Sequence, residues 1–122
     1  MPAPTDVELD ALATRVVNWL GIPPGHVEAA QVPGTVAAVV DFIREHGLGD
    51  PGTADPWYAV DSGSRIATGA VLLAARLVRR RNSPGGIESF SGANDQVAYV
   101  RRTDPDVALL LGLDGYRRLV VG

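Results

Sequence analysis

The chain has 122 residues, of which 46% are hydrophobic and 20% are charged, and its formal net charge is -3. This length fits one domain with a single core, and the composition is typical of a globular protein rather than of a disordered chain. The absence of cysteine excludes disulfides, thiolate metal sites and cysteine nucleophiles. The first residues show no secretory pattern, and the apolar run Ile66–Ala75 is too short to span a bilayer, so we expect a soluble cytoplasmic protein.

The basic residues are unusual in kind and in placement. All eleven are arginines, whose planar guanidinium suits fixed, bidentate contacts. Residues 1–61 hold nine acids and two arginines, whereas residues 62–122 hold nine arginines and five acids. The negative total does not favour electrostatic binding of nucleic acid, but the uneven distribution permits head-to-tail attraction between copies of the chain.

The spacing of apolar residues predicts two helices in the first half. The first spans about 5–20, is capped by Thr5 or Asp6, and carries one apolar face made of Leu9, Leu12, Val16 and Trp19. The second spans about 33–46, because Pro33 suits a first helical position, and its apolar face holds Val36, Val39, Val40 and Ile43. A loop follows, and we expect its Trp57 and Tyr58 to fold back onto the core.

A third helix, from a cap at Ser62 or Ser64 to about Arg81, is the most strongly patterned segment. Its apolar surface is wider than one stripe and includes Ile66, Ala70, Leu73 and Leu77. Such a helix either lies at the centre of a core or packs against a neighbouring subunit, and this one could do both. We expect part of its surface to be covered by other polypeptides.

The last third predicts mixed structure. Residues 87–90 and 96–102 look like two extended arms around a turn at 92–95, and Asp104 caps a short fourth helix that begins at Pro105. The fold class is therefore mainly α, a small four-helix bundle with a β-hairpin between the third and fourth helices and an extended C-terminal tail. We expect one domain over 1–115 and a docking tail over 116–122.

No enzyme signature emerges from the candidate residues. His26 and His46 have no carboxylates or nucleophile converging on them, and they read as capping or surface histidines. The glycines of 83–86 follow a helix and lack a lysine, unlike a phosphate-binding loop. We expect no catalytic activity, no cofactor and no metal.

Three arginine-bearing segments leave alternatives open. The run Arg79–Arg81 can be a solvated helix end that compensates the dipole, a contact with a protein partner, or a contact with nucleic acid. Arg101 and Arg102 either form local ion pairs at a helix entry or anchor an interface. The tail combines an aromatic, two arginines and aliphatic residues, so it either docks on a partner or packs on its own core.

Two segments of the second half resemble a known family. The run AVLLAARLVRRRNSPGGIESF at 70–90, and VRRTDPDV at 100–107 followed by GYRR at 115–118, are similar to the head-to-tail adaptor (connector) proteins of tailed bacteriophages. The likeness is strongest from Ile66 to Gly122. It is greatest to adaptors from phages or prophages of high-GC actinobacteria, an origin that fits the arginine-only basic set.

The resemblance implies a virion protein at the head–tail interface, which is present in the host cytoplasm during assembly. It implies a homo-oligomeric ring of about twelve copies that binds the portal protein, extends the DNA channel and receives a stopper or tail-completion protein, with no membrane contact. Carried over to this chain, the portal-docking residues are Tyr116, Arg117, Arg118, Leu119, Val120 and Val121. The subunit interface is then expected at Arg79, Arg80, Arg81, Asn82, Tyr99, Arg101, Arg102 and Asp104. The alternative is a small arginine-rich protein that binds nucleic acid.

Overall fold

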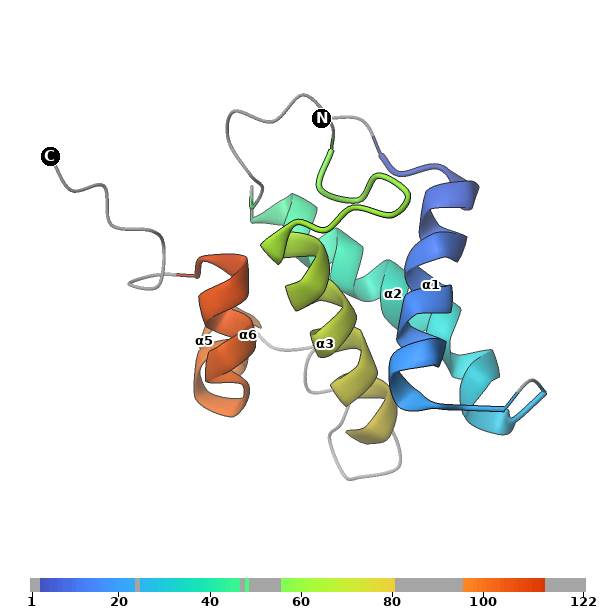
Figure 1. The fold of residues 1–122 in the computed structure, drawn as a ribbon. Coiled ribbons are helices and arrows are strands. Elements are labelled where there is room, and N and C mark those ends of the chain that lie inside the picture. Colours follow the sequence, from blue (N-terminus) through green and yellow to red (C-terminus); the bar gives the residue numbers. More distant parts are fainter. Residues whose placement is uncertain (1–2, 24, 47, 49–55, 81–95, 114–122) are drawn as a thin grey trace, which may run out of the picture.

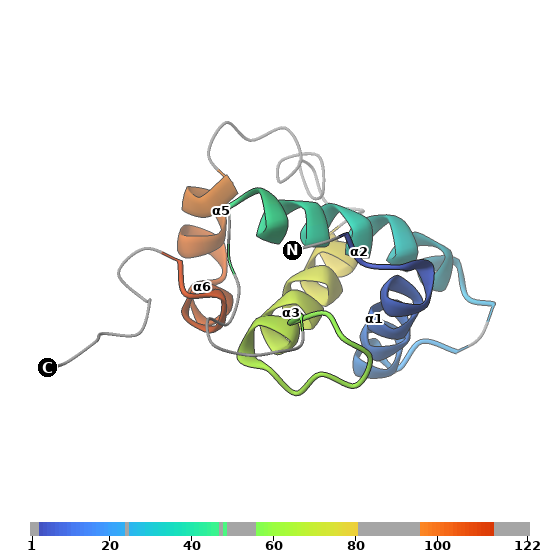
Figure 2. The ribbon, with the colours of Figure 1, turned by 90° about the horizontal axis from the view of Figure 1, so that it is seen from above.

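The computed structural model describes residues 3–23, 25–46, 48, 56–80 and 96–113. Within these ranges the chain forms the helices α1 (Asp6–Leu20), α2 (Val27–Glu45), α3 (Arg65–Arg80), α5 (Gln96–Thr103) and α6 (Pro105–Leu111), and none of these residues lies in a strand. The prediction of a mainly helical fold is confirmed. Figure 1 shows α3 in the middle, with α1 on one side and α5 and α6 on the other. In Figure 2, α2 runs along one side of both α1 and α3.

Helix α1 follows its local sequence signals. Thr5 is the N-cap of a capping box: its Oγ1 accepts from the Glu8 N–H at 3.3 Å, and its own N–H donates to the Glu8 carboxylate at 2.8 Å. Gly21 ends the helix in the left-handed conformation, with φ 68°. The expectation that Trp19 belongs to the buried face of this helix is wrong, because Trp19 is 64% exposed.

Helix α2 begins six residues earlier than the sequence predicts. His26 is its N-cap and accepts from the Glu28 N–H through Nδ1 at 3.2 Å, so Pro33 lies inside the helix rather than at its start. The preference of proline for the first turn of a helix is overridden here by this upstream cap, which agrees with the expectation of a capping or surface histidine at position 26. The predicted apolar face is confirmed, since Val36, Val39, Val40 and Ile43 are all buried.

Helix α3 is enclosed by its own chain. The Ser64 side chain caps it by accepting from the Ala67 N–H at 3.1 Å, as predicted. It packs against α1, α2 and α6, and it buries Ile66, Ala67, Gly69, Ala70, Val71, Leu73, Ala74, Ala75, Leu77 and Val78. Its own chain therefore covers most of this apolar surface, as expected for a helix at the centre of a core, and Leu72 is only partly buried. Trp57 and Tyr58 also fold back onto the core, in an edge-to-face contact with ring centroids 5.3 Å apart.

The expected strand at 96–102 is wrong, because these residues form α5. Alternation over four residues is too short a signal to separate a strand from a helix, and Val100 and the partly buried Val97 are spaced for one helical face. The other expected arm, 87–90, lies outside the described residues. Pro105 disfavours helix at Asp104, so α5 and α6 are separate helices, and Gly112 ends α6 in the left-handed conformation.

Candidate functional site

The most elaborate polar cluster joins α3 to the junction of α5 and α6. Arg76 and Arg80 lie one helical turn apart on α3. The two Asp106 carboxylate oxygens each accept from Arg76, at 2.6 Å and 2.6 Å, and Asp104 accepts from the same guanidinium at 3.1 Å. Arg80 makes a second bidentate pair with Asp104, at 2.8 and 2.6 Å. We call these four residues the arginine–aspartate cluster.

The cluster combines a buried carboxylate with guanidinium groups that are only partly exposed. Asp104 is 2% exposed, so its carboxylate depends on the two guanidinium groups for the contacts that water would otherwise provide. Hydrogen bonds from Arg76 lower the pKa of Asp106 to about 2. The same hydrogen bonds raise the pKa of Arg76, and the bond to Asp104 raises the pKa of Arg80. Two bidentate arginine–carboxylate pairs of this kind have a fixed geometry and suit a structural contact between helices.

The role of Asp104 differs from the one its sequence position suggests. It occupies the N-cap position of α6, but its side chain makes no capping hydrogen bond. Its carboxylate is directed to α3 instead, where it meets arginines that are 24 and 28 residues away in the sequence. No local spacing rule links residues so far apart. The sequence therefore pointed to Asp104 and Arg80 as interface residues, but it did not show that they pair with each other, and it missed Arg76.

The other α3 arginines also contact their own chain. Arg79 donates to the Leu20 carbonyl at 3.0 Å and lies 3.4 Å from the Glu28 carboxylate, which ties the end of α3 to the turn between α1 and α2. Arg65, at the opposite end, donates to the Leu110 carbonyl at 2.8 Å. These contacts weaken the reading of this arginine run as a nucleic-acid surface.

The remaining predicted interface residues that the structure describes lie on α5. Arg101 and Arg102 are exposed on α5, and Tyr99 is half-buried beside Arg80, whose pKa it helps to raise. Arg81 and Asn82 lie outside the described residues, as does the whole proposed docking tail, Tyr116–Val121.

Sequence reading missed a groove between α1 and α3. It has a volume of about 340 Å³ and is lined by Arg15, Asn18, Trp19, Thr68, Val71 and Leu72. Arg15 is held in place by a hydrogen bond to the Ser62 carbonyl at 2.8 Å. Helical spacing could have indicated that Trp19 lies outside the buried face of α1. Leu12, Val16 and Leu20 follow one another at intervals of four residues, and Trp19 does not fall in this series.

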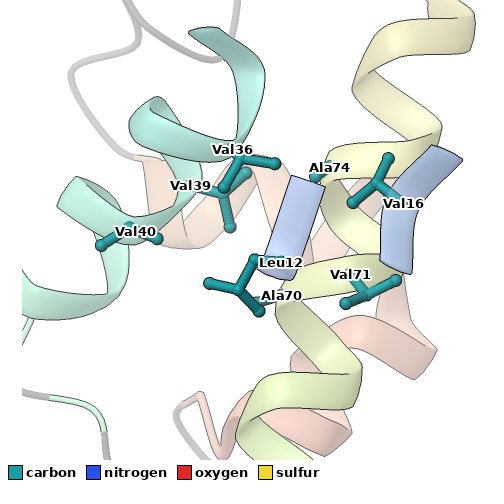
Figure 3. Close-up of a pocket in the computed structure, with 8 residues that line it drawn as sticks. All are labelled: Leu12, Val16, Val36, Val39, Val40, Ala70, Val71 and Ala74. Atoms are coloured by element: carbon teal, nitrogen blue, oxygen red, sulfur yellow. The ribbon is translucent and has the colours of Figure 1, made fainter. Parts of the chain in front are cut away.

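A small void between α1, α2 and α3 is lined by aliphatic side chains alone. Figure 3 shows the side chains around a void of about 10 Å³, which come from α1, α2 and α3 and are all aliphatic. A water needs polar partners to occupy so small a space, so this void is a packing gap. Among the residues that the structure describes, no three His, Asp or Glu side chains gather to hold a metal ion. None of the described helices combines the length and apolarity needed to cross a membrane.

Comparison of the chain with protein-family models, with curated proteins and with solved structures found no match.

Proposed function

We propose that this protein is a structural head-to-tail adaptor of a tailed bacteriophage. Copies of it would form a ring below the portal protein, extend the DNA channel and receive a stopper or tail-completion protein. The chain would act by assembly rather than by turnover, and it would meet DNA only as the genome passes through the channel.

The observation that carries this proposal is the arginine–aspartate cluster. The resemblance to phage adaptors rests on separate segments, and two of them, around 70–80 and 100–107, supply all four residues of the cluster. Residues that look like scattered motifs in the sequence therefore belong to one contact between α3 and the α5–α6 junction. Because these segments meet in one contact, they support the resemblance to phage adaptors together rather than one by one.

The exposed parts of the same region suggest how the proposed adaptor uses it. The cluster fixes α5 and α6 against α3, and Arg101 and Arg102 then project from α5. Rigid placement of exposed arginines lowers the entropy lost when a partner binds them. On this proposal the α5–α6 region faces a neighbouring subunit, and residues 116–122 reach the portal protein.

The proposal is tested by binding to the portal protein encoded in the same genome. The full chain is expected to bind purified portal rings, and a chain ending at Gly115 is expected to keep its helical circular dichroism and lose that binding. Retained binding by the shortened chain would remove 116–122 from the docking role. Failure of the full chain to bind the portal would contradict the adaptor function.

A further inference from the structure

Arg15 on α1 differs from the arginines of α3 in how its charge is met. Its guanidinium donates to the Ser62 carbonyl at 2.8 Å, and among the residues that the structure describes no carboxylate forms an ion pair with it. Arg76 and Arg80 are half-buried like Arg15, but each binds the carboxylate of Asp104. A carbonyl oxygen accepts a hydrogen bond without neutralising the cation, so Arg15 keeps its positive charge and further donors for an anion.

The surroundings of Arg15 are aromatic and aliphatic. Trp19 lies four residues further along α1, so the two side chains are neighbours on that helix, and both line the groove together with Val71 and Leu72 of α3. The groove has a volume of about 340 Å³, which leaves room for an aliphatic side chain. Tryptophan and arginine are among the residue types most enriched at the centres of protein interfaces. The groove therefore fits an apolar side chain that has a negative charge close to it.

The form of the groove favours a protein segment over a small molecule or a nucleic acid. Sites for small molecules usually enclose most of the ligand, whereas this groove leaves Trp19, one of its own lining residues, 64% exposed. A protein segment can continue along α1 and α3 beyond the groove and gather contacts there. Nucleic acid needs several cations along its backbone, but the other charged residues of α1 are the acids Asp6, Glu8 and Asp10.

We infer that this groove is a docking site for an acidic, aliphatic segment of another protein. An aliphatic side chain of the segment packs against Trp19, Val71 and Leu72, and a glutamate or aspartate one helical turn away pairs with Arg15. Because the Ser62 carbonyl already holds the guanidinium, less side-chain entropy is lost when the carboxylate binds. The identity of the partner rests on the proposed function: in an adaptor it is the stopper or tail-completion protein, since that proposal assigns the α5–α6 region to a neighbouring subunit and residues 116–122 to the portal.

The fluorescence of Trp19 reports on this groove. The chain has two tryptophans, and Trp57 is 2% exposed, so quenching by acrylamide acts mainly on Trp19. The probe is a blocked, alanine-based helical peptide that carries two leucines four residues apart and one glutamate a turn further on. The control peptide has glutamine in place of the glutamate. We expect the glutamate peptide to protect Trp19 from quenching and to bind about fivefold more tightly than the control peptide. Equal protection by both peptides, or protection by neither, would overturn the inference.

Charge reversal tests the pairing with Arg15. Arg15→Glu is expected to weaken binding of the glutamate peptide by about fivefold or more, and to bind instead a peptide with lysine at that position. A groove that had only lost its shape would bind neither peptide. The control, Arg44→Glu, makes the same charge change at an exposed position near the end of α2 and is expected to bind the glutamate peptide as the native chain does. Unchanged peptide preference in folded Arg15→Glu would contradict the pairing.

The apolar part of the groove is tested with a second pair of variants. Leu72→Ser is expected to weaken binding of the glutamate peptide by about fivefold, whereas Val7→Ser changes a 68% exposed residue of α1 outside the groove lining and is expected to have no effect. Circular dichroism of each variant checks that the helices are retained. If protection of Trp19 rises with the concentration of the chain alone, a second copy occupies the groove and the inference is wrong.

Phage particles separate this inference from the proposed function. If a phage that encodes Arg15→Glu yields particles that contain the chain and complete tails, the docking site is wrong and the adaptor function stands. If the glutamate peptide binds the native chain but purified particles lack the chain, the docking site stands and the adaptor function is wrong.

Discussion

Arg80 on α3 and Asp104 at the start of α6 form a bidentate ion pair with nitrogen–oxygen distances of 2.8 and 2.6 Å, and the aspartate is 2% exposed. Because Arg76 reaches the same carboxylate, one buried anion holds two cations and joins the last two described helices to the centre of the molecule. We therefore expect Asp104 to contribute more to the stability of the α5–α6 region than the exposed carboxylate of Asp106 does.

Removing that anion should be costly. Asp104→Asn leaves two guanidinium groups without their shared carboxylate, and we expect the free energy of unfolding to fall by about 3 kcal/mol. The control is Asp106→Asn, which neutralises a side chain that is 56% exposed and should cost less than about 1 kcal/mol. Urea unfolding followed by circular dichroism measures both. Equal losses for the two variants would show that burial of Asp104 does not set its contribution.

Acid should weaken the contact between Arg76 and Asp106. The pKa of Asp106 is lowered to about 2 in the folded protein, from an ordinary value of 3.8, so its stabilising contribution is present above about pH 4 and is lost as pH falls toward 2. We expect the difference in unfolding free energy between the native chain and Asp106→Asn to shrink over this range. A difference that stayed constant from pH 5 to pH 2 would contradict the pairing.

Close contact between α3 and α6 gives a steric test. A Cβ atom at Gly69 would lie 2.9 Å from Leu111 Cδ2 and 3.1 Å from Leu110 Cβ, so Gly69→Val should displace α6 and destabilise the fold by about 2 kcal/mol. A Cβ atom at Gly34 on α2 would meet no atom within 4 Å, so Gly34→Val should be nearly neutral. The two melting temperatures provide the comparison. A Gly69→Val protein as stable as Gly34→Val would mean that α6 does not pack this closely.

Neighbouring leucines on α3 test how completely the chain covers this helix. Leu73 is fully buried, whereas Leu72 is half-buried and lines the groove beside Trp19. Leu73→Asp places an unpaired charge in the core and should cost about 4 kcal/mol or more, while Leu72→Asp should cost far less because its carboxylate can reach water. Thermal unfolding distinguishes them. A mild effect at Leu73 would remove it from the core.

Local signals account for the parts of the fold that the sequence predicts well. Thr5, Ser64, Gly21 and Gly112 act within one helical turn, so their capping roles are readable without knowledge of the tertiary structure. The start of α2 was misplaced because Pro33 offers a strong local preference that the His26 cap overrides.

The errors in the second half have a different origin. Residues 96–102 carry too short an alternation to specify a strand, and packing of Val100 against the core selects a helix. The cluster of Arg76, Arg80, Asp104 and Asp106 depends on tertiary contact across more than twenty residues, which periodicity does not encode. For the same reason, the width of the apolar surface on α3 indicated burial but could not say that the chain itself provides the cover.

The most direct test of the adaptor function is an image reconstruction of the neck of purified phage particles, with mass spectrometry of the same preparation. We predict that peptides of this chain are present and that a ring of helical subunits, into which this fold fits, lies between the portal and the first tail protein. Particles with a complete neck that lack these peptides would contradict the account.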